Sequence, residues 1–162
     1  RLGALLERKG VEVQYTRRED RELTLHGRVD MGEEFRSAAL VSIHLNHSGR
    51  PATRGVETYW FTSGSLALAR RVQARLVEAV GATDRGVHRE NFVVVKYGSF
   101  PACLVEVGYL SNPEEERLLL DPAYQDKAVE GIARGLLETL ATDPGALGTG
   151  PSGMQPTGGS GR

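Results

Sequence analysis

The stretch ACLVEVGYLSNP, residues 102–113, decides the fold of this chain. Residues 102–107 are apolar apart from Glu106, and such a run is typical of a central strand that is covered on both faces of a sheet. A short acidic helix is expected to begin after Asn112 and Pro113. The stretch therefore predicts a buried strand with a carboxylate near its carboxyl end, followed at once by a helix.

Helical and strand patterns alternate along the rest of the chain. Apolar residues three and four apart predict helices near Leu2, after a Thr24 N-cap, over 66–80 and over 128–140. Short alternating or β-branched runs predict further strands over residues 11–15, 40–46, 55–61 and 92–95. This alternation predicts an α/β fold, a layered domain with a largely parallel or mixed central sheet flanked by helices.

The composition fits one globular domain with its own core. The 162 residues include 20 basic and 21 acidic side chains, and the net charge of -1 argues against nucleic acid or an anionic membrane as a partner. No apolar stretch is long enough to span a bilayer. A single cysteine, Cys103, excludes an internal disulfide and is expected in the core. We assign residues 1–140 to the domain and residues 141–162, rich in Gly, Pro, Ser and Thr, to a disordered tail.

The predicted strand over residues 40–46 carries polar side chains on one face only. Its period of two separates an aliphatic face from a face that carries Ser42, His44 and Asn46. A lone histidine is more often a hydrogen-bonded core residue. The polar neighbours on the same face, close to the end of the strand, favour a ligand or catalytic role for His44.

Glu106 is a carboxylate in a stretch that otherwise has the pattern of a fully buried strand. An isolated buried charge is unfavourable, so this group must be ion-paired, protonated or close to a metal. A structural ion pair with an arginine is the simpler alternative. Because open α/β sheets bind ligands at the carboxyl ends of their strands, the position of Glu106 favours a functional role.

Other polar residues give weaker signals. Glu57 is equally compatible with a site residue and with an exposed position on an edge strand. His26, His47 and His88 show no metal-ligand spacing and are expected at the surface. Ser42 lacks the Gly-x-Ser-x-Gly elbow of a serine hydrolase, and the sequence has no phosphate-binding glycine pattern. One histidine and one carboxylate at neighbouring strand ends suit metal-assisted hydrolysis, in which zinc holds a water and a glutamate accepts its proton.

Five blocks of the chain occur in a characteristic order between residues 1 and 140. They are VSIHLN at 41–46, GVETY at 55–59, DRGV at 84–87, NF at 91–92 and LVEVGYLSNP at 104–113. In this order and spacing they resemble the zinc-dependent N-acetylmuramoyl-L-alanine amidases, which cut bacterial peptidoglycan. The resemblance implies that His44 is a zinc ligand and Glu106 the catalytic glutamate, with Asn46 and Glu57 shaping the substrate site. It implies hydrolysis of the amide between the lactyl group of N-acetylmuramic acid and L-alanine of the stem peptide.

The same resemblance implies Zn²⁺ as cofactor, peptidoglycan as partner and a periplasmic or extracellular location in the cell envelope. It leaves open an activator protein or a wall-binding domain. Members of the family begin with a strand ending in Gly-His and with a following glutamate, which supply two further zinc ligands, and this chain begins after both. We therefore expect a domain without its first strand, with an exposed apolar sheet edge, a weak zinc site and no activity in this form.

Two other functions stay open from the sequence. A non-catalytic envelope-binding or regulatory pseudo-amidase would keep the fold, although it has no physical reason to keep a buried carboxylate at Glu106. A metallopeptidase that cuts peptide bonds of the stem would share the zinc chemistry. The product separates these enzymes, because an amidase releases a stem peptide with L-alanine at its amino terminus.

Overall fold

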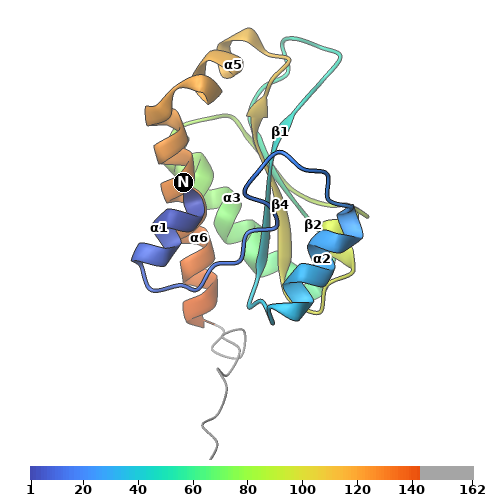
Figure 1. Cartoon of the computed structure of the whole chain (residues 1–162). Helices are drawn as coiled ribbons and strands as arrows, with labels where there is room; N and C mark the ends of the chain where they lie inside the picture. The colour runs from blue at the N-terminus through green and yellow to red at the C-terminus, as the bar shows by residue number, and fades with distance from the viewer. Residues whose placement is uncertain (143–162) are drawn as a thin grey trace, which may run out of the picture.

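A four-stranded sheet forms the centre of the structure, a computed structural model that describes residues 1–142 (Figure 1). The strands are β1 (Leu40–Asn46), β2 (Val56–Trp60), β3 (Asp84–Arg89) and β4 (Ala102–Tyr109), in the order β1-β4-β2-β3. The pairs β1–β4 and β2–β3 are parallel, and β4–β2 is antiparallel. The predicted α/β fold with a mixed sheet is thus confirmed. Residues 143–162, on which most of the predicted tail falls, lie outside the described residues.

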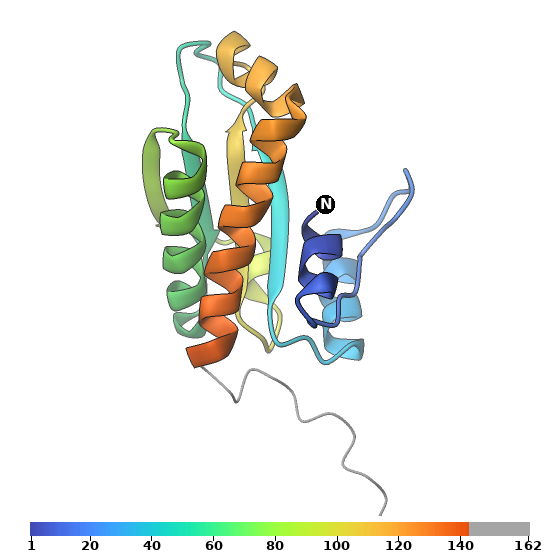
Figure 2. The same cartoon turned by 90° about the vertical axis from the view of Figure 1, so that its left-hand side faces the viewer.

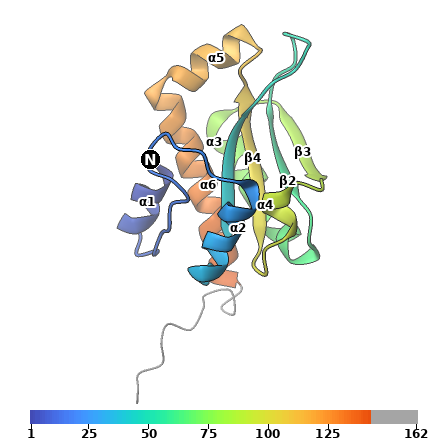
Figure 3. The ribbon, with the colours of Figure 1, turned by 45° about the vertical axis from the view of Figure 1, so that its right-hand side comes forward.

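Helices cover both faces of this sheet. They are α1 (Leu2–Arg8), α2 (Leu25–Glu34), α3 (Leu66–Val80) after the short 3-10 turn η1 (Ser63–Ser65), α4 (Val93–Lys96), α5 (Pro113–Leu120) and α6 (Pro122–Thr142). Figures 2 and 3 show α3 and α6 on one face and α2 and α4 on the other. None of the helices within residues 1–142 is long and apolar enough to cross a bilayer.

The face under α3 and α6 holds the larger hydrophobic core. Val105 of the central strand is fully buried there, together with Leu68 and Leu76 of α3 and Ile132 of α6. The two helices can approach closely because glycines of α6 lie where they meet. A Cβ added to Gly135 would lie 2.5 Å from the Cα of Val72.

Several predicted helix ends are confirmed by their hydrogen bonds and backbone angles. Thr24 caps α2, because its side chain accepts a 3.0 Å hydrogen bond from the backbone N–H of Gly27. The helix predicted over residues 66–80 has those bounds, and Gly81 ends it with the left-handed φ of 67° that glycine adopts without strain. These local signals decide where the elements begin and end.

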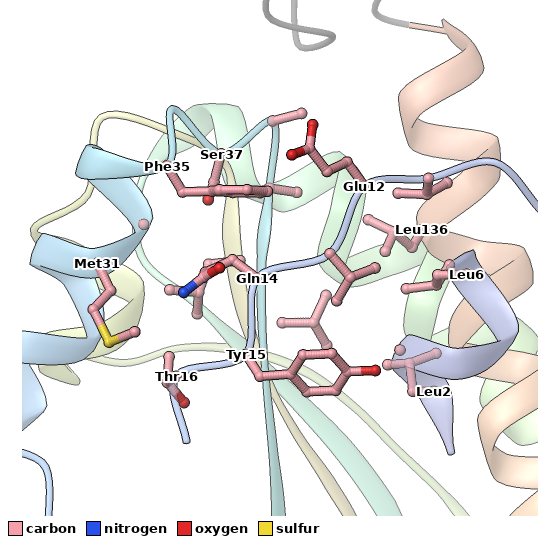
Figure 4. A pocket seen from close by; sticks show the side chains of 18 of the residues that line it. Leu2, Leu6, Glu12, Gln14, Tyr15, Thr16, Met31, Phe35, Ser37 and Leu136 are labelled. Atoms are coloured by element: carbon pink, nitrogen blue, oxygen red, sulfur yellow. The ribbon is translucent and has the colours of Figure 1, made fainter. Parts of the chain in front are cut away.

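The strand predicted over residues 11–15 is wrong, because this segment pairs with no other strand. It runs beside β1, and a cavity of about 390 Å³ is lined by both. Figure 4 shows Leu6 and Leu136 on one side of this cavity and Met31 and Phe35 on the other. An alternating pattern produces a strand only where a neighbouring backbone completes the hydrogen-bond ladder.

The expected apolar edge is present along β1, which is an outer strand of the described sheet. Ile43 and Leu45 on this strand are 47% and 46% exposed.

The strand predicted over residues 92–95 is also wrong, since residues 93–96 form the short helix α4. The valines favour a strand by intrinsic propensity, but Val94 and Val95 are buried in the second core, where they pack with Phe100 and Leu104. Tertiary packing outweighs propensity here. The neighbouring strand β3 was not predicted, because its charged and polar residues give no clear alternation.

The contact between α3 and α6 yields a stability test. Gly135→Ala is expected to destabilise the protein, although alanine is the better helix former by about 1 kcal/mol. The new Cβ would lie 2.5 Å from the Cα and 2.6 Å from the N of Val72. Overpacking of this kind costs about 1–3 kcal/mol, which urea unfolding measures. Gly64→Ala is the control, because a Cβ there meets nothing within 4 Å. Identical midpoints for the two variants would contradict the close helix contact.

Candidate active site

Three titratable side chains lie in one row across the middle of the sheet. His44 of β1 is paired in register with Glu106 of β4, and Glu106 is in turn paired with Glu57 of β2. Directly opposed residues on neighbouring strands point to the same face. This is the face of α2 and α4, because Leu104, two residues before Glu106, packs in the core that these helices cover. The structure thus brings together the residues that the sequence singled out.

Glu57 is buried, at 4% exposure, and both of its carboxylate oxygens have partners. Its Oε1 accepts hydrogen bonds of 2.6 Å from Asn46 Nδ2 and from the Tyr109 hydroxyl. Its Oε2 lies 3.3 Å from Arg85 Nε and 3.6 Å from His88 Nε2. A buried carboxylate with this many partners is held in one orientation. It therefore presents a fixed negative charge to its neighbour Glu106.

Glu106 has the opposite environment. Its Oε2 is buried and has no hydrogen-bond partner among residues 1–142, and no arginine of the described residues pairs with it. Desolvation by burial, and then the negative charge of Glu57, raise the pKa of Glu106 to about 7. Both the protonated and the ionised form are therefore populated at neutral pH. A carboxyl group of this kind is suited to take up and release a proton during a reaction.

His44 lies at the accessible side of the row. Its Nε2 is 3.1 Å from Ser42 Oγ, and which of the two donates depends on the tautomer of the ring. Desolvation, and then the positive charge of Arg28, lower the pKa of His44. The imidazole is therefore neutral at pH 7, which is the form that binds a metal ion.

The donors of the described residues do not complete a zinc site. Within residues 1–142, no three His, Cys, Asp or Glu side chains gather closely enough to hold a metal ion. A catalytic zinc takes three protein ligands, so His44 fits as one of them and the remaining donors are not supplied here. His26, His47 and His88 are exposed, as expected, and do not join His44 in such a group.

Helix α5 ties the ends of two site strands together. The Asn112 side chain caps this helix, and the carboxylate of buried Glu115 in its first turn is shared between two backbone N–H groups. Glu115 Oε1 accepts from Gly55 N and Oε2 accepts from Tyr109 N, both at 2.7 Å. The stretch LVEVGYLSNP thus continues from β4, which carries Glu106, into a helix that supports the candidate site.

The sequence analysis named Asn46 together with Glu57 but missed the other three partners of Glu57. Tyr109 lies in a block that was singled out, but its contact with Glu57 follows a register shift between β1 and β4 that the sequence does not show. Arg85 and His88 lie on the strand that was not predicted.

Cys103 is fully buried in the core, as the sequence predicts, and desolvation raises the pKa of its thiol to about 12, which excludes it as a nucleophile at neutral pH.

Comparisons with known proteins show the family to which this chain belongs. A sequence model of the family described as N-acetylmuramoyl-L-alanine amidase matches residues 1–138. The probable cell wall amidase LytH of Staphylococcus saprophyticus is 34% identical over 135 residues, which cover 83% of this chain and 45% of the relative. The N-acetylmuramoyl-L-alanine amidase LytC of Bacillus subtilis is 31% identical over 139 residues, which cover 83% of this chain and 28% of the relative. The chain spans less than half the length of these two curated relatives.

Solved structures show the same fold. The catalytic domain of CwlV, an N-acetylmuramoyl-L-alanine amidase from Bacillus (Paenibacillus) polymyxa, superposes with a TM-score of 0.84 at 40% identity, covering 86% of this chain and 79% of that one. The amidase AmiC2 of Nostoc punctiforme superposes with a TM-score of 0.83 at 35% identity, covering 86% and 78%. With its sequence matched from residue 1 to residue 138, this chain belongs to the N-acetylmuramoyl-L-alanine amidase family.

Proposed function

We propose that this domain hydrolyses the amide between N-acetylmuramic acid and L-alanine of the stem peptide in peptidoglycan. The observation that carries the proposal is the in-register pair of His44 and Glu106, in which Glu106 has a buried oxygen without a partner. Membership of the amidase family supports the substrate class. The unpartnered oxygen also favours an enzyme over a pseudo-amidase, because a binding module gains nothing from an unsatisfied buried carboxyl group.

Glu106 acts as the general base and then as the general acid. In its ionised form it takes a proton from the attacking water, whose oxygen bonds to the scissile carbonyl carbon. When the carbon–nitrogen bond breaks, Glu106 gives that proton to the departing nitrogen of L-alanine, which leaves as an amine. A pKa of about 7 suits both steps, because neither form is strongly favoured at neutral pH.

His44 is the residue of this chain that would hold zinc. When bound, zinc supplies polarisation of the scissile carbonyl and an acidified water. A complete ligand set needs donors beyond those of the described residues. Glu57 of β2 shapes the site from the other end of the row, where its charge helps to keep the pKa of Glu106 high. Asn46, on the same strand as His44, donates a hydrogen bond to Glu57.

A peptidoglycan substrate places this activity in the bacterial cell envelope, in the periplasm or outside the cell. LytH is named a probable cell wall amidase and LytC an N-acetylmuramoyl-L-alanine amidase, and both names support this location. A protein partner has a precedent, because the CwlD amidase of Clostridioides difficile, 28% identical with a TM-score of 0.81, was solved in complex with the GerS lipoprotein.

The central activity test removes the proton acceptor at position 106. Glu106→Gln is expected to lower kcat by about 10²–10⁴-fold, the usual contribution of a general base, with a small effect on KM. The assay uses the longest form of the protein that contains this domain, with zinc supplied. It follows the release from peptidoglycan of stem peptides that have L-alanine at the amino terminus. Glu130→Gln on the exposed side of α6 is the matched control. Full activity of the Glu106 variant would refute the assignment.

Zinc affinity tests the role of His44. Calorimetric titration of the 162-residue chain is expected to show weak zinc binding, because one histidine holds zinc far less tightly than three ligands do. His44→Ala should abolish that binding, whereas His88→Ala should leave it unchanged. Tight, stoichiometric zinc binding by the unaltered chain would contradict the incomplete ligand set.

The raised pKa of Glu106 makes a separate prediction about stability in metal-free protein. Below pH 4.5 the carboxyl group is protonated in both the folded and the unfolded state and has no effect. As the pH rises to about 7, the unfolded chain ionises freely and the folded protein does not, so the folded state loses stability. Glu106→Gln avoids this loss, and its advantage should grow by about 1–3 kcal/mol between pH 4.5 and 8, after allowance for solvent screening.

Urea unfolding at the two pH values, with EDTA present, measures this difference. Glu130→Gln should change stability by the same small amount at both. If the gain in free energy of unfolding from Glu106→Gln is the same at both pH values, the carboxyl group of Glu106 is not desolvated in the folded protein.

A further inference from the structure

Three ring side chains form a stacked cluster next to the row of titratable groups, on the side away from β1. Tyr59 lies two residues after Glu57 on β2 and therefore points to the same face of the sheet. Its ring centroid is 5.7 Å from that of His88 on β3 and 5.2 Å from that of Phe92, the residue that precedes α4. We call Tyr59, His88 and Phe92 the aromatic platform.

The aromatic platform touches the row through its histidine. His88 Nε2 lies 3.6 Å from Glu57 Oε2, and Glu57 is paired in register with Glu106. The same nitrogen lies 2.8 Å from the backbone oxygen of Arg85. A carbonyl oxygen only accepts hydrogen bonds, so Nε2 carries the hydrogen and Nδ1 of the neutral ring is an acceptor. Because the His88 side chain is 44% exposed, the aromatic platform combines ring surface with a polar group at the edge of the site.

Phe92 is the ring of the aromatic platform that presents apolar surface to solvent. It is 42% exposed, and within residues 1–142 no lysine or arginine lies over its face. Neighbouring rings are covered, since Arg89 lies 4.6 Å from the centroid of Phe61 and Lys96 lies 4.8 Å from that of Tyr97. Aromatic surface with a few polar groups beside it is the usual composition of a small-molecule site.

The covalent structure of the substrate brings a sugar ring to this part of the surface. In N-acetylmuramic acid the lactyl group is joined through an oxygen to C3 of the ring, so three bonds separate that ring carbon from the scissile carbonyl carbon. Three such bonds span about 4 Å at most. A carbonyl held between His44 and Glu106 therefore has the sugar ring directly beside the row. Beyond β4 the row continues through β2 to β3, where the aromatic platform lies.

We propose that the aromatic platform is the subsite for the pyranose ring of N-acetylmuramic acid. The proposal rests on the amidase function proposed above. The C–H groups on one face of a pyranose ring carry a small positive charge, and they pack against the negative face of the Phe92 ring. A hydroxyl group of the sugar donates a hydrogen bond to His88 Nδ1. The bound sugar then holds the lactyl carbonyl next to Glu106, and the stem peptide leaves the row on another side.

The kinetic test uses two substrates with the same scissile amide. One is a muramoyl peptide, and the other is the corresponding D-lactoyl peptide, which lacks the sugar ring. The wild-type protein, in the longest form that contains this domain and with zinc supplied, is expected to prefer the muramoyl peptide in kcat/KM. Phe92→Ala should lower kcat/KM for the muramoyl peptide by about 5- to 30-fold, mainly through KM, because the apolar contact with the sugar is lost. It should leave kcat/KM for the D-lactoyl peptide unchanged, and Phe92→Trp should keep the preference.

Leu120→Ala is the matched control, since Leu120 is an apolar side chain that is 73% exposed on α5. It should keep the wild-type preference for the muramoyl peptide. If Phe92→Ala lowers kcat/KM for both substrates equally, Phe92 supports the site or contacts the peptide, and the proposal is overturned. An unchanged ratio of the two kcat/KM values in Phe92→Ala overturns it as well.

A binding measurement separates this proposal from the amidase function. In NMR spectra of the 162-residue chain, N-acetylmuramic acid should shift the ring signals of His88 and Phe92, and D-lactate should not. Phe92→Ala should weaken the binding of the sugar. If N-acetylmuramic acid leaves the signals of the aromatic platform in place, or if D-lactate shifts them equally, the proposal is overturned. If the sugar binds there but the muramoyl peptide is not cleaved, the amidase function fails and the sugar subsite stands.

Discussion

The parallel pairing of β1 with β4 is the constraint on which the candidate site depends. It places the imidazole of His44 beside the carboxyl group of Glu106, on the face of the sheet that α2 and α4 cover. Because side chains alternate between faces, a slip of one residue in either strand would move one of these groups to the core under α3 and α6. The sequence of β4 is almost wholly apolar apart from Glu106. A slip of β4 by one residue would bury the carboxyl group of Glu106 in that core and turn a neighbouring valine toward the site, so the sequence opposes it.

Two glutamates on paired strands behave differently because their hydrogen-bond environments differ. Glu57 is the more buried, yet four side chains surround its carboxylate. Glu106 is less buried and has an oxygen without a partner. The carboxylate of Glu57 is held by its partners, whereas burial and the nearby Glu57 raise the pKa of Glu106 to about 7. The buried oxygen of Glu106 that has no hydrogen-bond partner lowers the free energy of unfolding, and such a cost is common at functional sites.

The sequence was sufficient for the elements whose signals are local. Period two on residues 41–46 and the apolar run around Glu106 predicted two neighbouring strand ends, and Gly81 marked a helix end correctly. It was insufficient wherever the outcome depends on a distant neighbour. Residues 11–15 lack a strand to pair with, and residues 93–96 become helical through packing. Tyr109, Arg85 and His88 could not be foreseen as partners of Glu57 either, because they meet it only when β2 lies antiparallel to β4 and parallel to β3.

The shared carboxylate of Glu115 gives α5 a mechanical role. One oxygen holds the backbone that enters β2 and the other holds the last residue of β4, whose hydroxyl in turn touches Glu57. Helix α5 is therefore joined by hydrogen bonds to the start of β2 and to the end of β4. Leu118 and Leu120, near the carboxyl end of α5, are 45% and 73% exposed. The position of α5 is thus linked, through two backbone hydrogen bonds, to the contact between Tyr109 and Glu57 that lies beside Glu106.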